Sequence, residues 1–391
     1  MDKISNSIEY RKLPMLFCIL TFSGVWCPND WNLSSKTMYK LYTIVQIISG
    51  ILFWFAILMN ILVGTHSEQI YENLFAISTL SYAIYKDFFV LRNKKLIMTF
   101  LQLCFEDEWY IPQDNIERTI IEKYNYETSW ITQTYAAGII TALAVKASTP
   151  MLKSQTSWAL PIPAWCPYRI DNFPNYFAAY VQEILGGVPM ICLHIGIDSL
   201  FVTLVLQLCT KLAVLKYRMK TTFNSHELEF DIPIKKHHNA DKILAKFADK
   251  HERILQFANQ INSAFQGILT GQVMVTIPNI CINVYLLSQH KGGISLNIID
   301  SFMCFGTCLI QIFLFCWYGN KITLHSTDVE DAVYEMNWPT LTVPMQKKLL
   351  TIMIRTTRKI KFAAGTFVMN IDSFIEIIKT SYSAFRVLQD T

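Results

Sequence analysis

Apolar stretches long enough to cross a lipid bilayer recur along the chain and restrict its fold more than any other feature. A helix needs about 20 mostly apolar residues to cross ~30 Å of hydrocarbon. Stretches of that kind occupy residues 38–63, 70–91, 129–151, 176–209, 262–287, 296–318 and 363–388. Backbone groups in hydrocarbon must be satisfied within the segment itself, so each stretch predicts a helix. The sequence therefore predicts an all-α integral membrane protein with seven transmembrane helices.

The balance of apolar and charged residues agrees with that prediction. Hydrophobic residues make up 52% of the chain and charged residues 16%, whereas a soluble domain has about 25% charged residues.

Lysine and arginine are distributed unevenly between the connections. Most of the 34 basic residues lie in the connections on one side, and the other side receives Lys153, Arg169 and Lys291. Short basic loops stay in the cytoplasm, which predicts a cytoplasmic N-terminus and an extracellular C-terminus. This inverted topology is the reverse of that of G-protein-coupled receptors. It also places the sequon at Asn32 on the cytoplasmic side, where it would stay unmodified.

The predicted spans divide the chain into six parts. Residues 13–25 predict a short interfacial or re-entrant helix, because Pro14 and Trp26 do not suit a cleaved signal. Residues 241–261 and 343–361 repeat apolar side chains at helical spacing between charges, which predicts an intracellular helical anchor region. The predicted parts are a cytoplasmic N-terminal segment (1–37), helices 1–4 (38–210), cytoplasmic loop and helices (211–261), helices 5–6 (262–320), the anchor (321–362) and helix 7 (363–391).

Enzymatic and metal signatures are not found in the sequence. No phosphate loop, GxGxxG, HExxH or GxSxG motif occurs, and each of these supports a specific chemistry. Cys304 and Cys308 lie one turn apart in a span, where packing between helices explains them better than metal binding. His237 and His238 lie in a lysine-rich polar loop. We therefore predict a protein that is not an enzyme and has no metal, cofactor or nucleic-acid partner.

The last predicted span mixes polar and apolar residues. Asn370, Asp372, Glu376 and Thr380 alternate with isoleucine and phenylalanine. Polar side chains are costly against lipid, so this helix is expected to face protein or water.

Motifs distributed along nearly the whole chain resemble those of the insect odorant receptor family. The order and spacing of these motifs carry the resemblance, since no single one is decisive. They are Gly24-Val25-Trp26-Cys27-Pro28, Leu160-Pro161 with Trp165 and Pro167, Tyr176, Tyr180, Gln182, Asp198, Gln207-Leu208, His251, Ile254, Leu255, Asn259, Asn262, Phe265, Tyr318-Gly319-Asn320, Ala364-Gly365-Thr366-Phe367, Phe374, Lys379, Ser381-Tyr382-Ser383 and Phe385.

The resemblance implies a subunit of a ligand-gated, non-selective cation channel in the plasma membrane of olfactory sensory neurons. Four subunits would surround one pore, with helix 7 of each forming the wall. The chain lacks the long second cytosolic loop of the shared co-receptor, which implies an odour-tuning subunit that forms a heterotetramer with that co-receptor.

The resemblance also implies roles for residues of helix 7. It places the gate at Val387 and Leu388, since a narrow apolar ring blocks ions. It places Gln389 and Asp390 at the outer mouth, where a carboxylate attracts cations. The residues that it implies for packing between subunits are Ser381, Tyr382, Ser383 and Phe385. The alternative role for these residues is hydrogen bonding between helices of one subunit. Arg386 departs from the expected small or apolar residue, and we expect it to extend toward the headgroups.

The ligand implied by the resemblance is a small hydrophobic odorant in the outer half of the helix bundle. A mostly apolar, aromatic-lined cavity suits such a ligand. Residues at that depth in helices 2, 3, 4 and 6 are Ser78, Tyr82, Ala142, Lys146, Tyr180, Ile184, Phe302 and Phe305, for each of which ordinary packing is the alternative. A lysine within a span needs a partner; Glu183 is the expected one, and an unpaired Lys146 would indicate an acidic odorant.

Two other classes remain open at this point. A gustatory receptor shares the architecture but usually ends in a different tyrosine-containing signature. A secondary transporter is expected to show internal repeats, and the chain has none.

Overall fold

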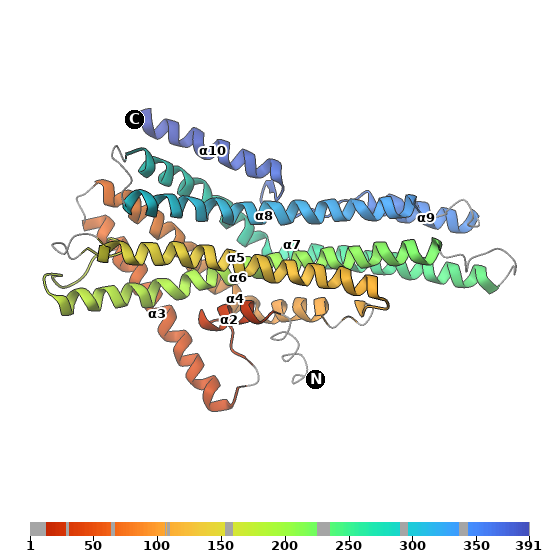
Figure 1. The fold of residues 1–391 in the computed structure, drawn as a ribbon, viewed down its shortest axis with the longest axis horizontal. Coiled ribbons are helices and arrows are strands. Elements are labelled where there is room, and N and C mark those ends of the chain that lie inside the picture. The colour runs from red at the N-terminus through yellow and green to blue at the C-terminus, as the bar shows by residue number, and fades with distance from the viewer. Residues whose placement is uncertain are drawn as a thin grey trace.

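The computed structural model describes residues 13–28, 31–63, 67–105, 107, 110–152, 159–224, 235–289, 296–335 and 343–390. Within these ranges the chain is almost entirely helical (Figure 1). The elements are α2 (Pro14–Phe22), α3 (Leu33–Val63), α4 (Ser67–Phe105), α5 (Asn115–Leu152), α6 (Phe173–Asn224), α7 (Lys235–Gln289), α8 (Leu296–Tyr334), α9 (Val343–Thr356), β1 (Ala363–Ala364), β2 (Phe367–Val368) and α10 (Ile371–Asp390).

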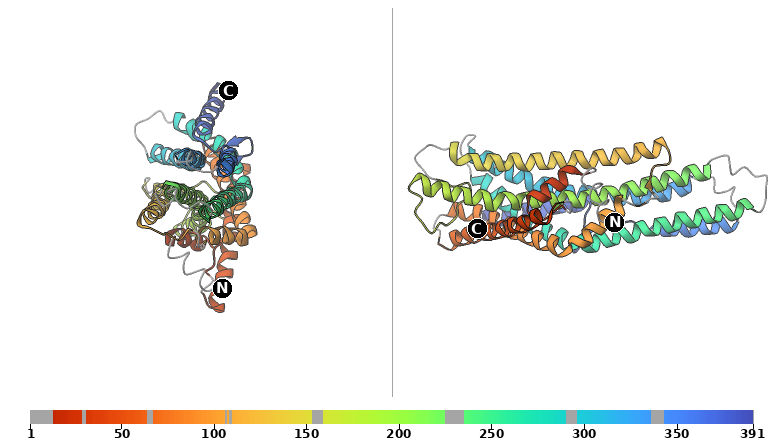
Figure 2. Two further views of the ribbon diagram at one scale, coloured as in Figure 1. Left: turned by 90° about the vertical axis from the view of Figure 1, so that its right-hand side faces the viewer. Right: turned by 90° about the horizontal axis from the view of Figure 1, so that it is seen from below.

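Several helices are much longer than a bilayer requires. Helices α6 and α7 contain 52 and 55 residues, or about 80 Å each at 1.5 Å per residue. They run side by side in an elongated bundle (Figures 1 and 2). We call the end where α7 ends and α8 begins the α7–α8 end, and the opposite end, where α6 ends and α7 begins, the α6–α7 end. Because the hydrocarbon core is ~30 Å thick, a large part of the bundle extends beyond it.

Five of the described helices are long and apolar enough to cross a membrane. They are α3, α4, α6, α7 and α8. Helix α6 is central, since it contacts α2, α3, α4, α5, α7 and α8, and most of its apolar segment is buried. Only 17% of the corresponding segment of α3, at the edge of the bundle, is buried. The all-helical membrane fold is therefore confirmed. Helices α5 and α10 are also long but more polar.

The start of the predicted seventh span is not helical. Residues 363–368 form a two-stranded antiparallel hairpin in which Ala363 pairs with Val368. Gly365, with φ of +60°, occupies the left-handed conformation that a tight turn favours. Helix α10 begins only at Ile371, where the Asn370 side chain accepts a hydrogen bond from the Ser373 N–H at 2.8 Å and so caps the helix. The prediction of one helix over 363–388 was wrong in its first two turns.

The hairpin packs on α7, and close backbone packing attaches the residue after it, Met369, to α8. A Cβ atom at Gly319 would lie 2.3 Å from the Met369 carbonyl oxygen, so the chain approaches α8 at a residue without a side chain. This contact positions α10, which packs against α7 and α8 at one edge of the bundle (Figures 1 and 2).

The remaining short helices pack on the long ones. Helix α2 buries Leu16, Phe17 and Leu20, and Leu20 lies over Gly196 of α6. Helix α9 packs on α7 and α8 near the α6–α7 end, where Arg355 bonds to Glu252 at 2.6 Å.

Candidate ligand cavity and polar network

A cavity of about 220 Å³ lies between α3, α4, α5, α6, α7 and α8, in the half of the bundle toward the α7–α8 end. Its walls are mostly apolar and include Phe53, Phe75, Leu80, Leu143 and Ile191. An apolar cavity of about 150 Å³ in another protein stays dry and binds benzene. The present cavity is large enough for a somewhat larger apolar molecule.

A loop closes one side of the cavity, to which it contributes Pro161 and Ile162. The Trp165 N–H donates to the Ala56 carbonyl at 3.0 Å, and the Asn60 side chain donates to the Pro163 carbonyl at 3.1 Å. Two hydrogen bonds to α3 therefore hold this loop in place. The motif Leu160-Pro161 to Pro167, noted in the sequence, contains the loop.

Three of the eight residues predicted to contact the ligand line the cavity: Ala142, Lys146 and Ile184. The structure does not bring the other five to its wall. The Ser78 hydroxyl donates to Asn279 at 2.6 Å, the Tyr82 hydroxyl to the Ile268 carbonyl at 2.6 Å, and the Tyr180 hydroxyl to the Ala147 carbonyl at 3.1 Å.

On α8 the predicted pair lies beside the face that lines the cavity. Phe302 is 64% exposed and Phe305 is half-buried. The lining residues of this helix are Asp300, Ser301, Cys304, Thr307 and Gln311. Their spacing of three to four residues defines one face of a helix. A polar stripe on an otherwise apolar span was therefore the sequence signal for this wall.

Lys146 has a different partner from the one expected. Its ammonium group lies 2.6 Å from Asp300 Oδ2, on α8, so the expected pair with Glu183 is wrong. The reason is helical geometry, since Asp300 opens the polar stripe of α8 that faces α5. Glu183 Oε2 accepts a 3.3 Å hydrogen bond from the Ile162 N–H. The other oxygen, Oε1, is buried and has no hydrogen-bond partner among the described residues.

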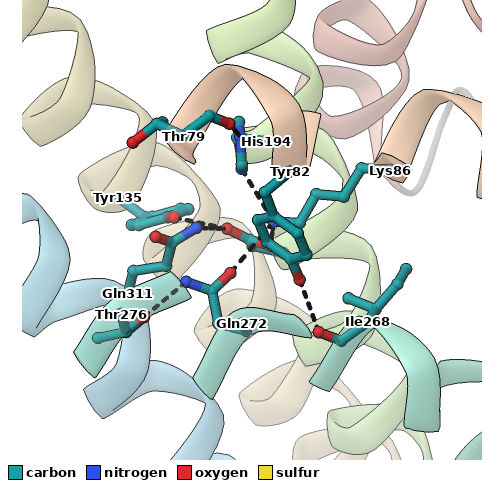
Figure 3. Close-up of polar contacts among 10 residues, drawn as sticks. Thr79, Tyr82, Lys86, Tyr135, His194, Ile268, Gln272, Thr276 and Gln311 are labelled. Atoms are coloured by element: carbon teal, nitrogen blue, oxygen red, sulfur yellow. Dashed lines mark hydrogen bonds and ion pairs between the residues drawn. The ribbon is translucent and has the colours of Figure 1, made fainter. Parts of the chain in front are cut away.

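A buried ion pair lies deeper in the bundle (Figure 3). The Lys86 ammonium of α4 is 2.5 Å from Asp198 Oδ1 of α6, and both side chains are almost fully buried. Asp198 Oδ2 also accepts hydrogen bonds from the Tyr135 hydroxyl at 2.8 Å and the Gln311 amide at 2.7 Å. A buried charge is tolerated when it is paired and its remaining sites are bonded. Charged residues within apolar spans were the sequence signal for this pair.

The ion pair belongs to a network that reaches the cavity and α7. His194 and Gln311 line the cavity, and His194 Nδ1 lies 3.0 Å from Lys86 Nζ. Lys86 also donates to Gln272 of α7 at 3.5 Å, and Gln272 donates to Thr276. Polar contacts thus run from the cavity wall to α7 (Figure 3), the helix against which α10 packs.

Helix α10 is buried on one side. Ser373, Ile377, Ser381 and Phe385 face the chain, spaced four residues apart. The Ser381 and Ser383 hydroxyls donate to the carbonyls of Ile377 and Lys379 in the same helix. Ser381 and Phe385 thus pack within the chain.

The other side of α10 is uncovered and contains two of the four residues predicted for the pore and two of those predicted for subunit packing. Tyr382, Ser383, Val387 and Gln389 are exposed, Val387 to 66%. Exposed Arg386 has its guanidinium carbon 5.9 Å from the centre of the Tyr382 ring. The side chains of Leu388 and Asp390 lie outside the described part of the structure.

A bundle of membrane-length helices around a mostly apolar cavity is the architecture of a multi-pass membrane receptor for small molecules. Comparison with known proteins identifies which receptor family this is. The family model described as 7tm odorant receptor matches residues 66–382. The chain therefore belongs to the odorant receptor family, whose members are receptors rather than enzymes.

Individual relatives agree with this assignment. Odorant receptor Or2 of Anopheles gambiae is 23% identical over 332 residues, which cover 83% of this chain and 85% of the relative. Odorant receptor 82a of Drosophila melanogaster is 22% identical over 232 residues, or 59% of this chain and 57% of that protein. The fold is similar to that of the insect olfactory receptor OR5 from Machilis hrabei in complex with eugenol, with a TM-score of 0.83, 14% identity and 99% of each chain covered.

Proposed function

We propose that this chain is the odour-tuning subunit of an odorant-gated, non-selective cation channel. It binds a small hydrophobic odorant and assembles with the co-receptor, as a heterotetramer, in the plasma membrane of olfactory sensory neurons. Helices α5 and α10 join the five apolar helices to give seven spans, with the N-terminus in the cytoplasm and the C-terminus outside.

The observation that carries the ligand part of the proposal is the cavity. It is lined by helices from all along the chain, its wall is mostly apolar, and its volume of about 220 Å³ suits a small molecule. A site of this kind binds apolar molecules by excluding water, with a few polar groups to set orientation.

The pore part of the proposal is supported by the uncovered side of α10. Charged Glu376, Lys379 and Arg386 are exposed there beside Tyr382 and Val387. Charged side chains within a membrane segment usually face protein or a water-filled cavity. Neighbouring subunits and a central pore would meet that requirement, with Val387 and Leu388 as the gate and Gln389 and Asp390 at the mouth.

The proposal is tested by whole-cell current in cells that express this chain with and without an insect odorant co-receptor, during exposure to a chemically broad odorant panel. We expect an odour-evoked cation current that requires both subunits and persists when G-protein signalling is blocked. Current that depends on G-protein activation, or substrate uptake without current, would contradict it.

A further inference from the structure

The charged groups around the cavity are not balanced. The carboxyl side chains of Glu72, Glu183 and Asp300 line it together with the ammonium group of Lys146. Asp300 already bonds to Lys146 at 2.6 Å. The nearby Lys86 is paired with Asp198, so that pair adds no net charge. The described wall therefore carries more carboxyl groups than cations.

Glu183 is a buried carboxyl group of this wall with one oxygen left unbonded by the described residues. The residue is 7% exposed, and its recorded hydrogen bond is the 3.3 Å contact from the Ile162 N–H to Oε2. Oε1 is buried with no partner among the described residues. A buried polar atom without a hydrogen-bond partner is unfavourable, and an ionised carboxylate offers about four acceptor positions. Rotation of the carboxyl group is soft, so either oxygen can turn toward a donor in the cavity.

We propose that the ligand of this chain is a small lipophilic amine whose ammonium group binds the Glu183 carboxylate while its apolar body occupies the cavity. This proposal rests on the proposed function, in which the cavity is the odorant site. The ammonium group supplies both the missing charge and a hydrogen-bond donor. A carboxylic acid of the same size meets the excess carboxyl groups and is rejected, and an alcohol supplies a donor without the charge.

The test is equilibrium binding of radiolabelled phenethylamine to the purified complex of this chain with the co-receptor in lipid nanodiscs. Phenethyl alcohol and phenylacetate compete as an alcohol and an acid of similar size, and nanodiscs that hold the co-receptor alone give the background. We expect the amine to bind at least about tenfold more tightly than the alcohol, and the acid more weakly still. This comparison needs no variant.

Two matched substitutions locate the contact. Glu183→Gln keeps the size of the side chain and removes its charge, and we expect it to weaken amine binding about 10- to 100-fold, the range for a lost charge-assisted hydrogen bond. Alcohol binding should change by less than about threefold. Glu122→Gln removes the same charge at an exposed residue of α5 that does not line the cavity, and it should weaken amine binding by less than about threefold. Melting without ligand shows whether each variant folds.

Several results would overturn the proposal. Equal binding of alcohol and amine, saturable binding of the acid alone, or loss of amine binding in Glu122→Gln to the same extent as in Glu183→Gln would each do so. If odorant-evoked currents persist in that case, the amine proposal fails while the proposed function stands. If no current appears with any odorant, the proposed function fails as well.

Discussion

The buried pair of Lys86 and Asp198 gives the sharpest stability prediction. In Lys86→Met, the Asp198 carboxylate keeps its hydrogen bonds from Tyr135 and Gln311 but loses the cation at 2.5 Å. Breaking a buried pair by removing one partner costs about 3–5 kcal/mol, because the remaining charge is uncompensated. At about 2 °C per kcal/mol for a long chain, the melting temperature of the co-receptor complex should fall by about 6–10 °C.

A neutral replacement of both partners separates charge from packing. Lys86→Gln combined with Asp198→Asn removes both charges and keeps hydrogen-bonding groups at both positions. The double variant should therefore melt at a higher temperature than either Lys86→Gln or Asp198→Asn alone. A double-mutant cycle measures this coupling, with thermal unfolding in nanodiscs as the assay.

Lys216→Met is the matched control, since Lys216 lies 3.9 Å from Asp328 with 30% of its side chain exposed. An exposed pair contributes about 0–1 kcal/mol, so this variant should melt within about 2 °C of the wild type. The reasoning is refuted if Lys86→Met behaves like Lys216→Met, or if the double variant loses as much stability as the two single changes together.

Three further predictions concern the cavity, the α6–α7 end and the pore. Ala142→Phe places a larger side chain in the cavity and should raise the odorant concentration for half-maximal current at least tenfold. The control Phe302→Ala, on the exposed side of α8, should leave that concentration within about threefold of the wild-type value. Equal effects of the two variants would contradict the cavity assignment. Arg218 bonds to the buried Glu117 carboxylate at 2.6 and 2.8 Å. Arg218→Met leaves this carboxylate without a cation and should destabilise the chain by about 3–5 kcal/mol, as measured in the same melting assay. An unchanged melting temperature would show that water or another cation replaces the arginine. Val387→Ala widens the proposed constriction and should raise the whole-cell current in the absence of odorant. A resting current equal to that of the wild type, with an unchanged odorant response, would place the gate elsewhere.

The helices could be predicted from the sequence because their signal is long. Each predicted span from 38–63 to 296–318 lies within one helix from α3 to α8, since about 20 apolar residues leave the backbone no other favourable structure. The hairpin at 363–368 could not be found this way, because Gly365 in a short apolar run fits both a turn and a helix. Its packing involves contacts with α7, such as the hydrogen bond from the Ala363 N–H to the Asn262 side chain, which is distant in sequence.

The wall of the cavity was predictable only in part. Three residues chosen by depth along a helix, Ala142, Lys146 and Ile184, line the cavity, but the rotation of each helix depends on its neighbours. This is why Phe302 lies outside while Asp300 and Gln311 line the cavity. The partner of Lys146 depends on the same rotation, and a single sequence contains no direct record of it.

The central claim is that odorant binding to this chain and ion conduction occur within one membrane complex. The most direct test is current through membrane patches excised from cells that express this chain with the co-receptor, in a bath without nucleotides. The account predicts that an active odorant opens cation channels in the excised patch, and that Ala142→Phe shifts the required concentration as it does in whole cells. Channels that respond in intact cells but stay closed in excised patches would contradict it, because the signal would then need soluble components of the cell.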